Sequence, residues 1–164
     1  MSLILIADDD DLHAGIVADA LREIGHVIEL ASDGLHALSA MRQKAFDAIV
    51  LDCEMPQMTG YQVLQSMRGD ARLANIPVLM LTARCAKRDR QLARLEGAAS
   101  FLVKPAALNL VIERVHSLLA RKTEVYHSPI YWQAPPAEEA RGWRDFAARQ
   151  GWRARQDSNL LPQD

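Results

Sequence analysis

The sequence predicts an α/β fold, a doubly wound five-stranded parallel sheet with helices on both faces. Three observations predict it. Short, mostly apolar segments alternate five times with longer amphipathic segments over residues 1–122, as in parallel sheets buried on both faces. Polar residues follow directly after several of the apolar segments. The chain has 164 residues, 49% hydrophobic and 24% charged, a globular composition that excludes wholesale disorder.

Five short apolar segments are the expected strands, at residues 3–7, 27–31, 48–51, 77–81 and 100–103. Each is four or five residues long, which suits a strand better than a helix. Because a segment of helical length follows each strand, neighbouring strands are expected to run parallel and to be joined by right-handed crossovers.

Amphipathic spacing predicts a helix after each strand. The first helix is expected to begin at a cap from Asp10 or Asp11 and to end at Gly25, because aspartate accepts hydrogen bonds from a first helical turn and glycine ends helices. Its expected apolar positions are Leu12, Ile16, Ala20 and Ile24. The second helix is expected around Leu35, Leu38 and Met41, and the third around Tyr61, Leu64 and Met67. The fourth is expected from Lys87 to Leu95, before Gly97. The fifth is expected from Leu108 to Leu119, and its apolar face would hold Leu108, Val111, Ile112, Val115 and Leu119.

Aromatic residues divide the chain near Lys122. Only Phe46, Tyr61 and Phe101 precede this point, whereas the last 42 residues hold six aromatic residues. We therefore expect one domain over residues 1–122 and a C-terminal tail over 123–164. The tail is too short for an output domain, so it is expected to be disordered or to form a short docking helix.

Charge, cysteine content and the N-terminus suggest a cytoplasmic protein. The net charge of −2 gives no general attraction to nucleic acid or to acidic lipid, so neither is an expected partner. The sequence holds no apolar run near the roughly 18 residues of a membrane span, and its start lacks the pattern of a signal peptide. Cys53 and Cys85 show no zinc spacing and are expected to be free thiols.

Charged and hydroxyl side chains follow four of the expected strands. The carboxyl ends of parallel strands meet at one edge of the sheet, where such folds place their sites. We therefore expect this edge to hold Asp8 and Asp9 after the first strand, Asp52 after the third, Thr82 after the fourth and Lys104 after the fifth. Clustered carboxylates repel unless a cation neutralises them, and Mg²⁺ prefers carboxylate and phosphate oxygens. This composition favours phosphoryl chemistry at a carboxylate.

Four segments resemble the receiver domain of two-component response regulators, of the chemotaxis-regulator type. They are Ile4–Asp10, Ile49–Pro56 with Gly60, Ile76–Ala83, and Gly97–Pro105. The resemblance covers about residues 1–121 and implies a flavodoxin-like (βα)5 fold with strand order 2-1-3-4-5. Position 106 departs from the commonest pattern, because it is alanine where a large apolar residue is frequent, which predicts looser packing under the last helix.

The resemblance also implies a function and a role for each site residue. Asp52 would accept a phosphoryl group from a sensor histidine kinase or a histidine phosphotransfer protein. Asp8, Asp9, Asp52 and the main-chain carbonyl of Glu54 would hold Mg²⁺. Lys104 would contact the phosphoryl group, while Thr82 and Phe101 would move once it is attached. The protein would be no enzyme beyond catalysing its own phosphorylation and dephosphorylation.

Two further expectations concern the surroundings of the site. Glu54 and Arg84 lie two residues beyond Asp52 and Thr82, so their side chains are expected to control the access of water to the phosphoryl group and hence its lifetime. In this family the readout surface consists of the fourth helix, the fifth strand and the fifth helix. Basic residues there would bind an acidic downstream partner or a dimer mate, namely Lys87, Arg88, Arg90 and Arg94.

Other classes of protein fit less well. A phosphatase of the haloacid dehalogenase type needs a second aspartate two residues after the first, and here Glu54 follows Asp52 at that spacing. Nucleotide-binding folds carry a glycine-rich loop after the first strand, and flavin binding wants a hydroxyl-rich one, where this chain has aspartates. The best alternative is a degenerate receiver that only docks partners, against which the intact acidic residues and Lys104 argue.

Overall fold

The structure is a computed structural model that describes residues 1–83 and 87–121. Strands and helices alternate along the chain, as the sequence predicts. The strands are β1 (Leu3–Ala7), β2 (Val27–Ala31), β3 (Ala48–Asp52), β4 (Val78–Thr82) and β5 (Ser100–Val103). The helices are α1 (Asp11–Glu23), α2 (Gly34–Gln43), α3 (Gly60–Gly69), α4 (Lys87–Leu95) and α5 (Leu108–Arg121).

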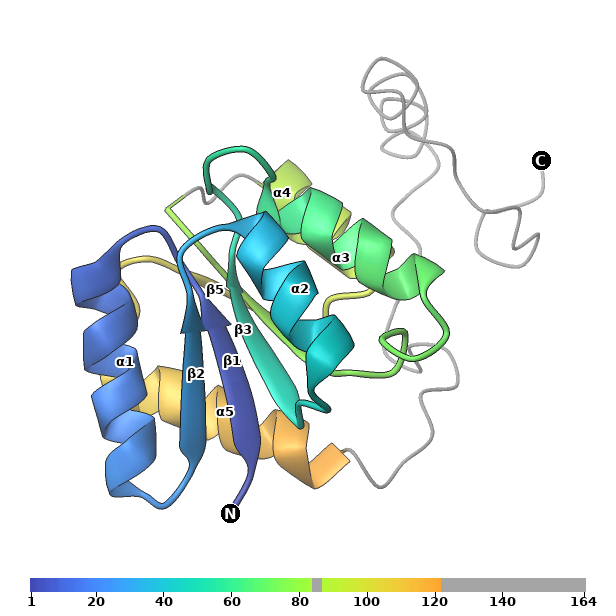
Figure 1. The fold of residues 1–164 in the computed structure, drawn as a ribbon. Helices are drawn as coiled ribbons and strands as arrows, with labels where there is room; N and C mark the ends of the chain where they lie inside the picture. The colour runs from blue at the N-terminus through green and yellow to red at the C-terminus, as the bar shows by residue number, and fades with distance from the viewer. Residues whose placement is uncertain (84–86, 122–164) are drawn as a thin grey trace. The chain divides into compact units, whose positions relative to one another are not determined.

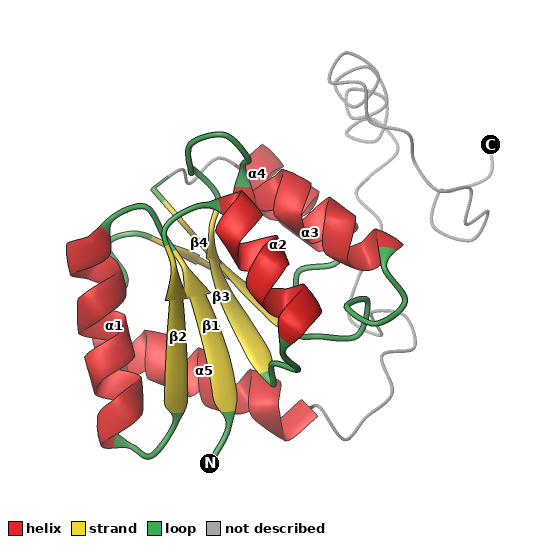
Figure 2. Ribbon diagram, viewed as in Figure 1, coloured by secondary structure: helices red, strands yellow, loops and turns green. Residues whose placement is uncertain are grey.

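All five strands form one parallel sheet in the order β2-β1-β3-β4-β5, which confirms the predicted fold class and strand order. The sheet lies between two layers of helices (Figures 1 and 2): α1 and α5 cover one face, and α2, α3 and α4 cover the other. From β1 the chain adds β2 on one side of the sheet, and β3 then lies on the other side of β1. Ligands of such sheets bind at this switch point, which the carboxyl ends of β1 and β3 flank.

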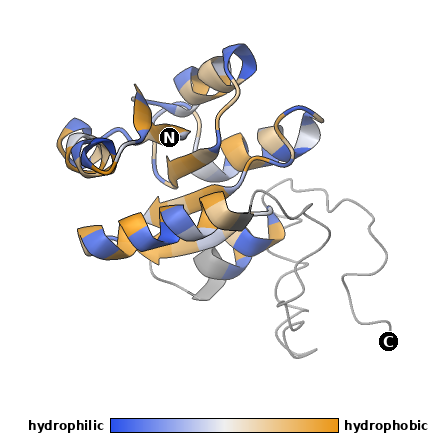
Figure 3. Cartoon of the chain, turned by 90° about the horizontal axis from the view of Figure 1, so that it is seen from below, coloured by the Kyte–Doolittle hydropathy of each residue, from blue (hydrophilic) through white to orange (hydrophobic). Residues whose placement is uncertain are grey.

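Each face of the sheet has its own hydrophobic core. On β1, Ile4 and Ile6 point to the α1–α5 side, whereas Leu5 and Ala7 point to the side of α2 and α3. All four are almost fully buried, because side chains along a strand alternate between its two faces and both faces are covered. In Figure 3 the strands are mostly hydrophobic, and the helices around them carry both hydrophobic and hydrophilic residues.

The predicted apolar face of α1 is not the face that packs on the sheet. The structure buries Ala14, Val17, Ala18 and Leu21, while Leu12, Ile16 and Ile24 are 75%, 52% and 46% exposed and Ala20 is partly exposed. The helix therefore has two apolar stripes, and the one with smaller residues faces inward. Ala14 and Ala18 can lie directly against the sheet because they have short side chains.

Smaller differences concern the ends and faces of other elements. Strand β3 includes Asp52 and β4 includes Thr82, and α5 continues to Arg121. On α5 the buried residues are Val111, Val115 and Leu118. The predicted Ile112 and Leu119 are partly buried and pack against the same core, whereas Leu108, predicted to face inward, is exposed. Leu35 on α2 is also mostly exposed. Ala106 is partly buried and packs against the core beneath α5, and the looser packing predicted there stays a prediction.

Some of the sequence-based expectations concern residues that the structure does not describe. Among the residues that the structure describes, no helix is both long and apolar enough to cross a membrane. The predicted tail over 123–164 and the thiol of Cys85 lie outside the described residues. Cys53 is buried and forms no disulfide among the described residues.

Candidate functional site

The carboxyl ends of four strands bring the predicted site residues together. Asp8 and Asp9 follow β1, and Asp52 ends β3. Carboxylate oxygens of these three residues lie within 4.8 Å of one another. Asp8 and Asp52 are buried, and Asp9 is exposed, so the cluster is reached from solvent on the side of Asp9.

Backbone amides just beyond the two strands fix the buried carboxylates. Oδ1 of Asp8 accepts a hydrogen bond from the Asp10 amide at 3.0 Å, and Oδ1 of Asp52 accepts one from the Glu54 amide at 3.0 Å. Each hydrogen bond closes an Asx turn, in which an aspartate side chain accepts a hydrogen bond from the backbone amide two residues later in the chain. The same short-range chemistry starts α1, where Asp10 is the cap and Asp11, the other predicted candidate, is the first residue of the helix.

Gly60 brings the start of α3 against the end of β3. Its amide donates to the carbonyl of Cys53 at 3.0 Å. A Cβ at position 60 would collide with the main-chain carbonyl oxygen of Asp52, so a side chain larger than hydrogen cannot be placed there without moving the backbone of the central aspartate.

Lys104 joins the two buried carboxylates. Its Nζ lies 2.7 Å from Oδ2 of Asp8 and 3.0 Å from Oδ2 of Asp52. The position follows from the sheet, because Val103 pairs with Thr82 and the Lys104 amide donates to the Thr82 carbonyl at 2.7 Å. The lysine side chain is only 17% exposed, so its charge acts on the site with little screening by solvent.

Burial and neighbouring charges shift the pKa values of Asp52, Asp8 and Lys104 in different directions. Burial raises the pKa of the Asp52 carboxyl above its usual value, and Asp8 adds to this, while the Glu54 amide and Lys104 oppose it. Burial also raises the pKa of Asp8, but hydrogen bonds from Lys104, the Asp10 amide and His13 outweigh it and bring the pKa below its usual value. Burial lowers the pKa of Lys104, yet its bonds to both aspartates outweigh this and raise it.

The directions of these pKa shifts indicate which kind of ion the site can bind. Lys104 stays protonated and contacts Asp8 and Asp52, so one ammonium group accompanies a cluster of three carboxyl groups. The remaining negative charge and the all-oxygen set of donors fit a hard divalent cation such as Mg²⁺.

His13 is a member of the site that the sequence prediction missed, since it was expected to be a surface residue or a satisfied core residue. Its Nδ1 lies 2.8 Å from Oδ2 of Asp8. The signal was local: Asp10 caps α1, and His13 lies in the first turn of that helix, where its own amide donates to Oδ1 of Asp10 at 3.1 Å. Sequence spacing alone does not show that the ring turns back toward β1.

The remaining predicted site residues surround the cluster. Thr82 is fully buried at the end of β4, and Phe101 on β5 is half-buried against the core formed with α2 and α3. Glu54 is exposed, whereas Arg84, the second residue expected to control the access of water, lies outside the described residues. On α4, Arg94 is exposed, and the side chains of Lys87, Arg88 and Arg90 lie outside what the structure describes.

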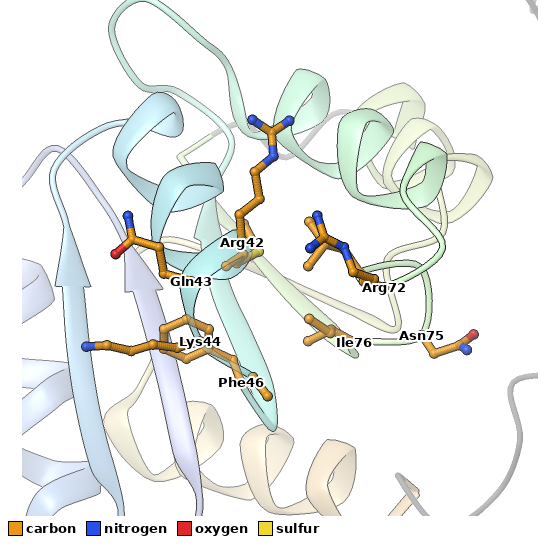
Figure 4. A pocket seen from close by; sticks show the side chains of 10 residues that line it. Arg42, Gln43, Lys44, Phe46, Arg72, Asn75 and Ile76 are labelled. Carbon is orange, nitrogen blue, oxygen red and sulfur yellow. The ribbon is translucent and has the colours of Figure 1, made fainter.

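A shallow pocket of about 400 Å³ lies elsewhere, between the loops that precede β3 and β4 (Figure 4). The described residues that line it include basic Arg42, Lys44 and Arg72 and apolar residues such as Phe46, and none of them is acidic. These loops enter the amino ends of the strands, so the pocket is at the sheet edge opposite the acidic cluster and takes no part in its chemistry.

Comparison with known proteins identifies relatives of the chain. A family model for the response regulator receiver domain matches residues 4–116. The chain is 38% identical over 120 residues to the chemotaxis protein CheY of Pseudomonas aeruginosa, covering 72% of this chain and 96% of CheY. It is 34% identical over 127 residues to the transcriptional regulatory protein QseB of Haemophilus influenzae, covering 77% of this chain and 57% of QseB. The structure of the chemotaxis protein CheY4 of Vibrio cholerae matches with a TM-score of 0.69 at 30% identity, covering 73% of this chain and 99% of CheY4.

The matches agree with the geometry of the site. The family model spans β1 to α5 and includes every strand that contributes to the acidic cluster. The chain spans little more than half the length of QseB, a protein with a sequence region that this chain does not match. The sheet order, the acidic cluster and these matches together show that the chain belongs to the family of receiver domains of two-component response regulators.

Proposed function

We propose that Asp52 accepts a phosphoryl group from a histidine kinase or a histidine phosphotransfer protein, and that Mg²⁺ assists the reaction. The observation that carries the proposal is the Asp52 carboxylate, held between the Glu54 amide and Lys104 beside two more aspartates. Asp8, Asp9, Asp52 and the Glu54 main-chain carbonyl would hold the ion. Bound there, the ion would neutralise charge on the phosphoryl oxygens during transfer.

The proposed reaction exchanges one bond to phosphorus for another. A carboxylate oxygen of Asp52 forms a bond to phosphorus as the bond to the donor's histidine nitrogen breaks, and the electron pair stays on that nitrogen, which takes up a proton. Lys104 already contacts Asp52 and can donate to a phosphoryl oxygen next to it. Apart from its own phosphorylation and dephosphorylation, we expect the protein to catalyse no reaction.

Attachment of the phosphoryl group would then change the protein's contacts. The new dianion can accept hydrogen bonds from the Thr82 hydroxyl and from Lys104 only in the modified state, so it would shift an existing equilibrium between two conformations. Phe101 would turn further inward. The surface of α4, β5 and α5, with the basic residues Lys87, Arg88, Arg90 and Arg94, would bind an acidic protein partner or a second copy of the chain.

The exposed stripe on α1 is the surface that we propose for the protein phosphodonor. Leu12 and Ile16 are exposed on the helix that starts two residues after Asp9, so an apolar face lies next to the acceptor site. Ile16→Glu should slow phosphotransfer from a histidine kinase and leave labelling by acetyl phosphate unchanged. Equal transfer from the kinase to both proteins would place the docking surface elsewhere.

The proposal extends to the lifetime of the phosphoryl group, to the cellular location of the protein and to its other partners. We expect Glu54 and Arg84 to restrict the access of water to the phosphoryl group, the protein to act in the cytoplasm, and the receiver domain itself to bind neither nucleic acid nor membrane. For the lifetime, the measurement is the dephosphorylation rate of Glu54→Ala, Arg84→Ala and the double variant. Rates within about twofold of the wild type, roughly 0.4 kcal/mol in barrier, would exclude this role.

The proposal is tested by incubating the protein with acetyl phosphate and Mg²⁺ and measuring its intact mass. We expect one phosphate adduct, which fails to form in EDTA. An unchanged mass in the presence of Mg²⁺ would instead favour the degenerate receiver that only docks partners, and an adduct that forms equally well in EDTA would exclude the proposed role of the ion.

A further inference from the structure

We propose that His13 is a positioning residue for Asp8: its ring holds this carboxylate in the orientation in which it serves as a ligand of the divalent ion. The inference rests on the proposed function, because it takes Asp8 to be a metal ligand. It goes beyond that function by assigning to α1 a side chain that tunes the affinity for the ion.

The contact between the two residues has a defined direction. Nδ1 of His13 lies 2.8 Å from Oδ2 of Asp8. The ionised carboxylate can only accept hydrogen bonds, so Nδ1 carries the hydrogen and donates it. The His13 backbone is fixed as well, because its amide donates to the capping carboxylate of Asp10 at 3.1 Å. The ring therefore links β1 to the capped first turn of α1.

The Asp8 carboxylate has room for a cation beside this contact. It accepts the Asp10 amide on Oδ1, and it accepts Lys104 and His13 on Oδ2. A carboxylate offers about four lone-pair positions, so these three donors leave one for an ion. Lys104 also donates to Asp52, whereas the His13 ring donates to Asp8, which makes the histidine the donor dedicated to this ligand.

The geometry favours a positioning role over direct ligation. The acidic group whose ligand atoms lie within 4.8 Å of one another consists of Asp8, Asp9 and Asp52 and does not include His13. Donors that contact a ligand without touching the metal orient it, and their loss typically weakens metal affinity 10- to 100-fold. Since His13 is one of three donors to Asp8, we expect an effect at the lower end of this range.

Two substitutions separate hydrogen bonding from packing. His13→Leu keeps an apolar body of similar size without a donor. His13→Asn carries an amide nitrogen near the position of Nδ1 and can restore the bond. His36→Leu is the matched control, because His36 also lies in the first turn of an aspartate-capped helix, with Nδ1 3.2 Å from Oδ2 of Asp33, but on α2, outside the acidic cluster.

The experiment titrates MgCl₂ into the full chain by calorimetry and measures acetyl phosphate labelling across the same range of Mg²⁺. We expect His13→Leu to weaken Mg²⁺ binding about tenfold and to shift the Mg²⁺ dependence of labelling equally, while the rate at saturating Mg²⁺ stays within about twofold. His13→Asn should recover most of the affinity, and His36→Leu should match the wild type. Thermal unfolding in EDTA confirms that each variant folds.

The outcomes distinguish this inference from the function on which it rests. Wild-type affinity in His13→Leu would overturn the positioning role and leave the proposed function intact. The positioning role would also be overturned if His13→Leu lowered the labelling rate at every Mg²⁺ concentration without shifting the Mg²⁺ concentration that gives half the maximal rate. That pattern would indicate damage to the structure. A wild-type protein that binds no Mg²⁺ would overturn the proposed function itself, and this inference with it.

Discussion

The Asp52 carboxylate destabilises the folded receiver domain whenever it is ionised and no cation is bound. Its pKa in the folded protein lies above the ordinary value of 3.8, mainly because it is buried, so the folded state binds this proton more tightly than the unfolded chain does. The destabilisation is absent below pH 3.8, develops as the pH rises from this ordinary value to the raised pKa, and is complete above the raised pKa.

Asp52→Asn is therefore expected to raise the Tm measured at pH 7 in EDTA, and the gain should shrink as the pH falls toward the ordinary pKa of aspartate. Asp19→Asn is the control, because Asp19 is 75% exposed in its ion pair with Arg22 and such pairs contribute about 0–1 kcal/mol. A lower Tm for Asp52→Asn at pH 7, or a gain of the same size at acid pH, would contradict the assigned direction.

A second prediction at this scale concerns the contact of Gly60 with the backbone of Asp52. Because a Cβ at position 60 collides with the Asp52 carbonyl oxygen, Gly60→Ala should lower the free energy of unfolding by about 1–3 kcal/mol. In Gly15→Ala the added Cβ meets nothing within 4 Å on α1, so this control should be stabilised by roughly 0.5–1 kcal/mol. Denaturant unfolding measures both, and equal effects of the two changes would exclude the steric argument.

Site residues were predictable where the backbone alone brings them together. Asp8, Asp52 and Lys104 lie at the ends of parallel strands, so the sheet places them at one edge whatever their rotamers. The contact of His13 with Asp8 depends on the direction of one side chain, which spacing does not determine. The role of Glu54 and Arg84 stays a prediction, because Arg84 lies outside the described residues.

At the scale of elements, α1 shows why an apolar pattern can identify a helix and still indicate the wrong face. Its sequence contains two apolar stripes, and the sequence alone favoured the one with the larger side chains. The sheet selects the other, because Ala14 and Ala18 allow the helix to approach closely. The strands were easier to predict, since both of their faces are buried and no choice of face arises.

The assignment of the α1 face is tested by the same substitution on both sides of the helix. Leu21 is fully buried and Leu12 is 75% exposed. Leu21→Ala should lower the free energy of unfolding by about 2–5 kcal/mol, whereas Leu12→Ala should change it by less than about 0.5 kcal/mol. Chemical denaturation of the two variants decides the point, and the reverse order would restore the face that the sequence predicted.

At the scale of the whole molecule, every group proposed to bind the ion or the phosphoryl group comes from β1, β3, β4, β5 and the residues that closely follow them. A chain ending at Lys122 should therefore fold cooperatively and accept phosphate from acetyl phosphate at a rate within about twofold of the full chain, roughly 0.4 kcal/mol in barrier. Circular dichroism and intact-mass labelling measure the two properties. Loss of either would show that residues 123–164 belong to the domain.

The central claim is that the phosphoryl group is carried by Asp52, and chemical trapping tests it most directly. Borohydride reduces an aspartyl phosphate to homoserine, so the protein is treated with acetyl phosphate and Mg²⁺, reduced, digested and sequenced by mass spectrometry. We predict homoserine at position 52 and unmodified aspartate at positions 8 and 9. Homoserine at either of those positions with Asp52 unmodified, or phosphate retained on a histidine or a serine, would contradict the account.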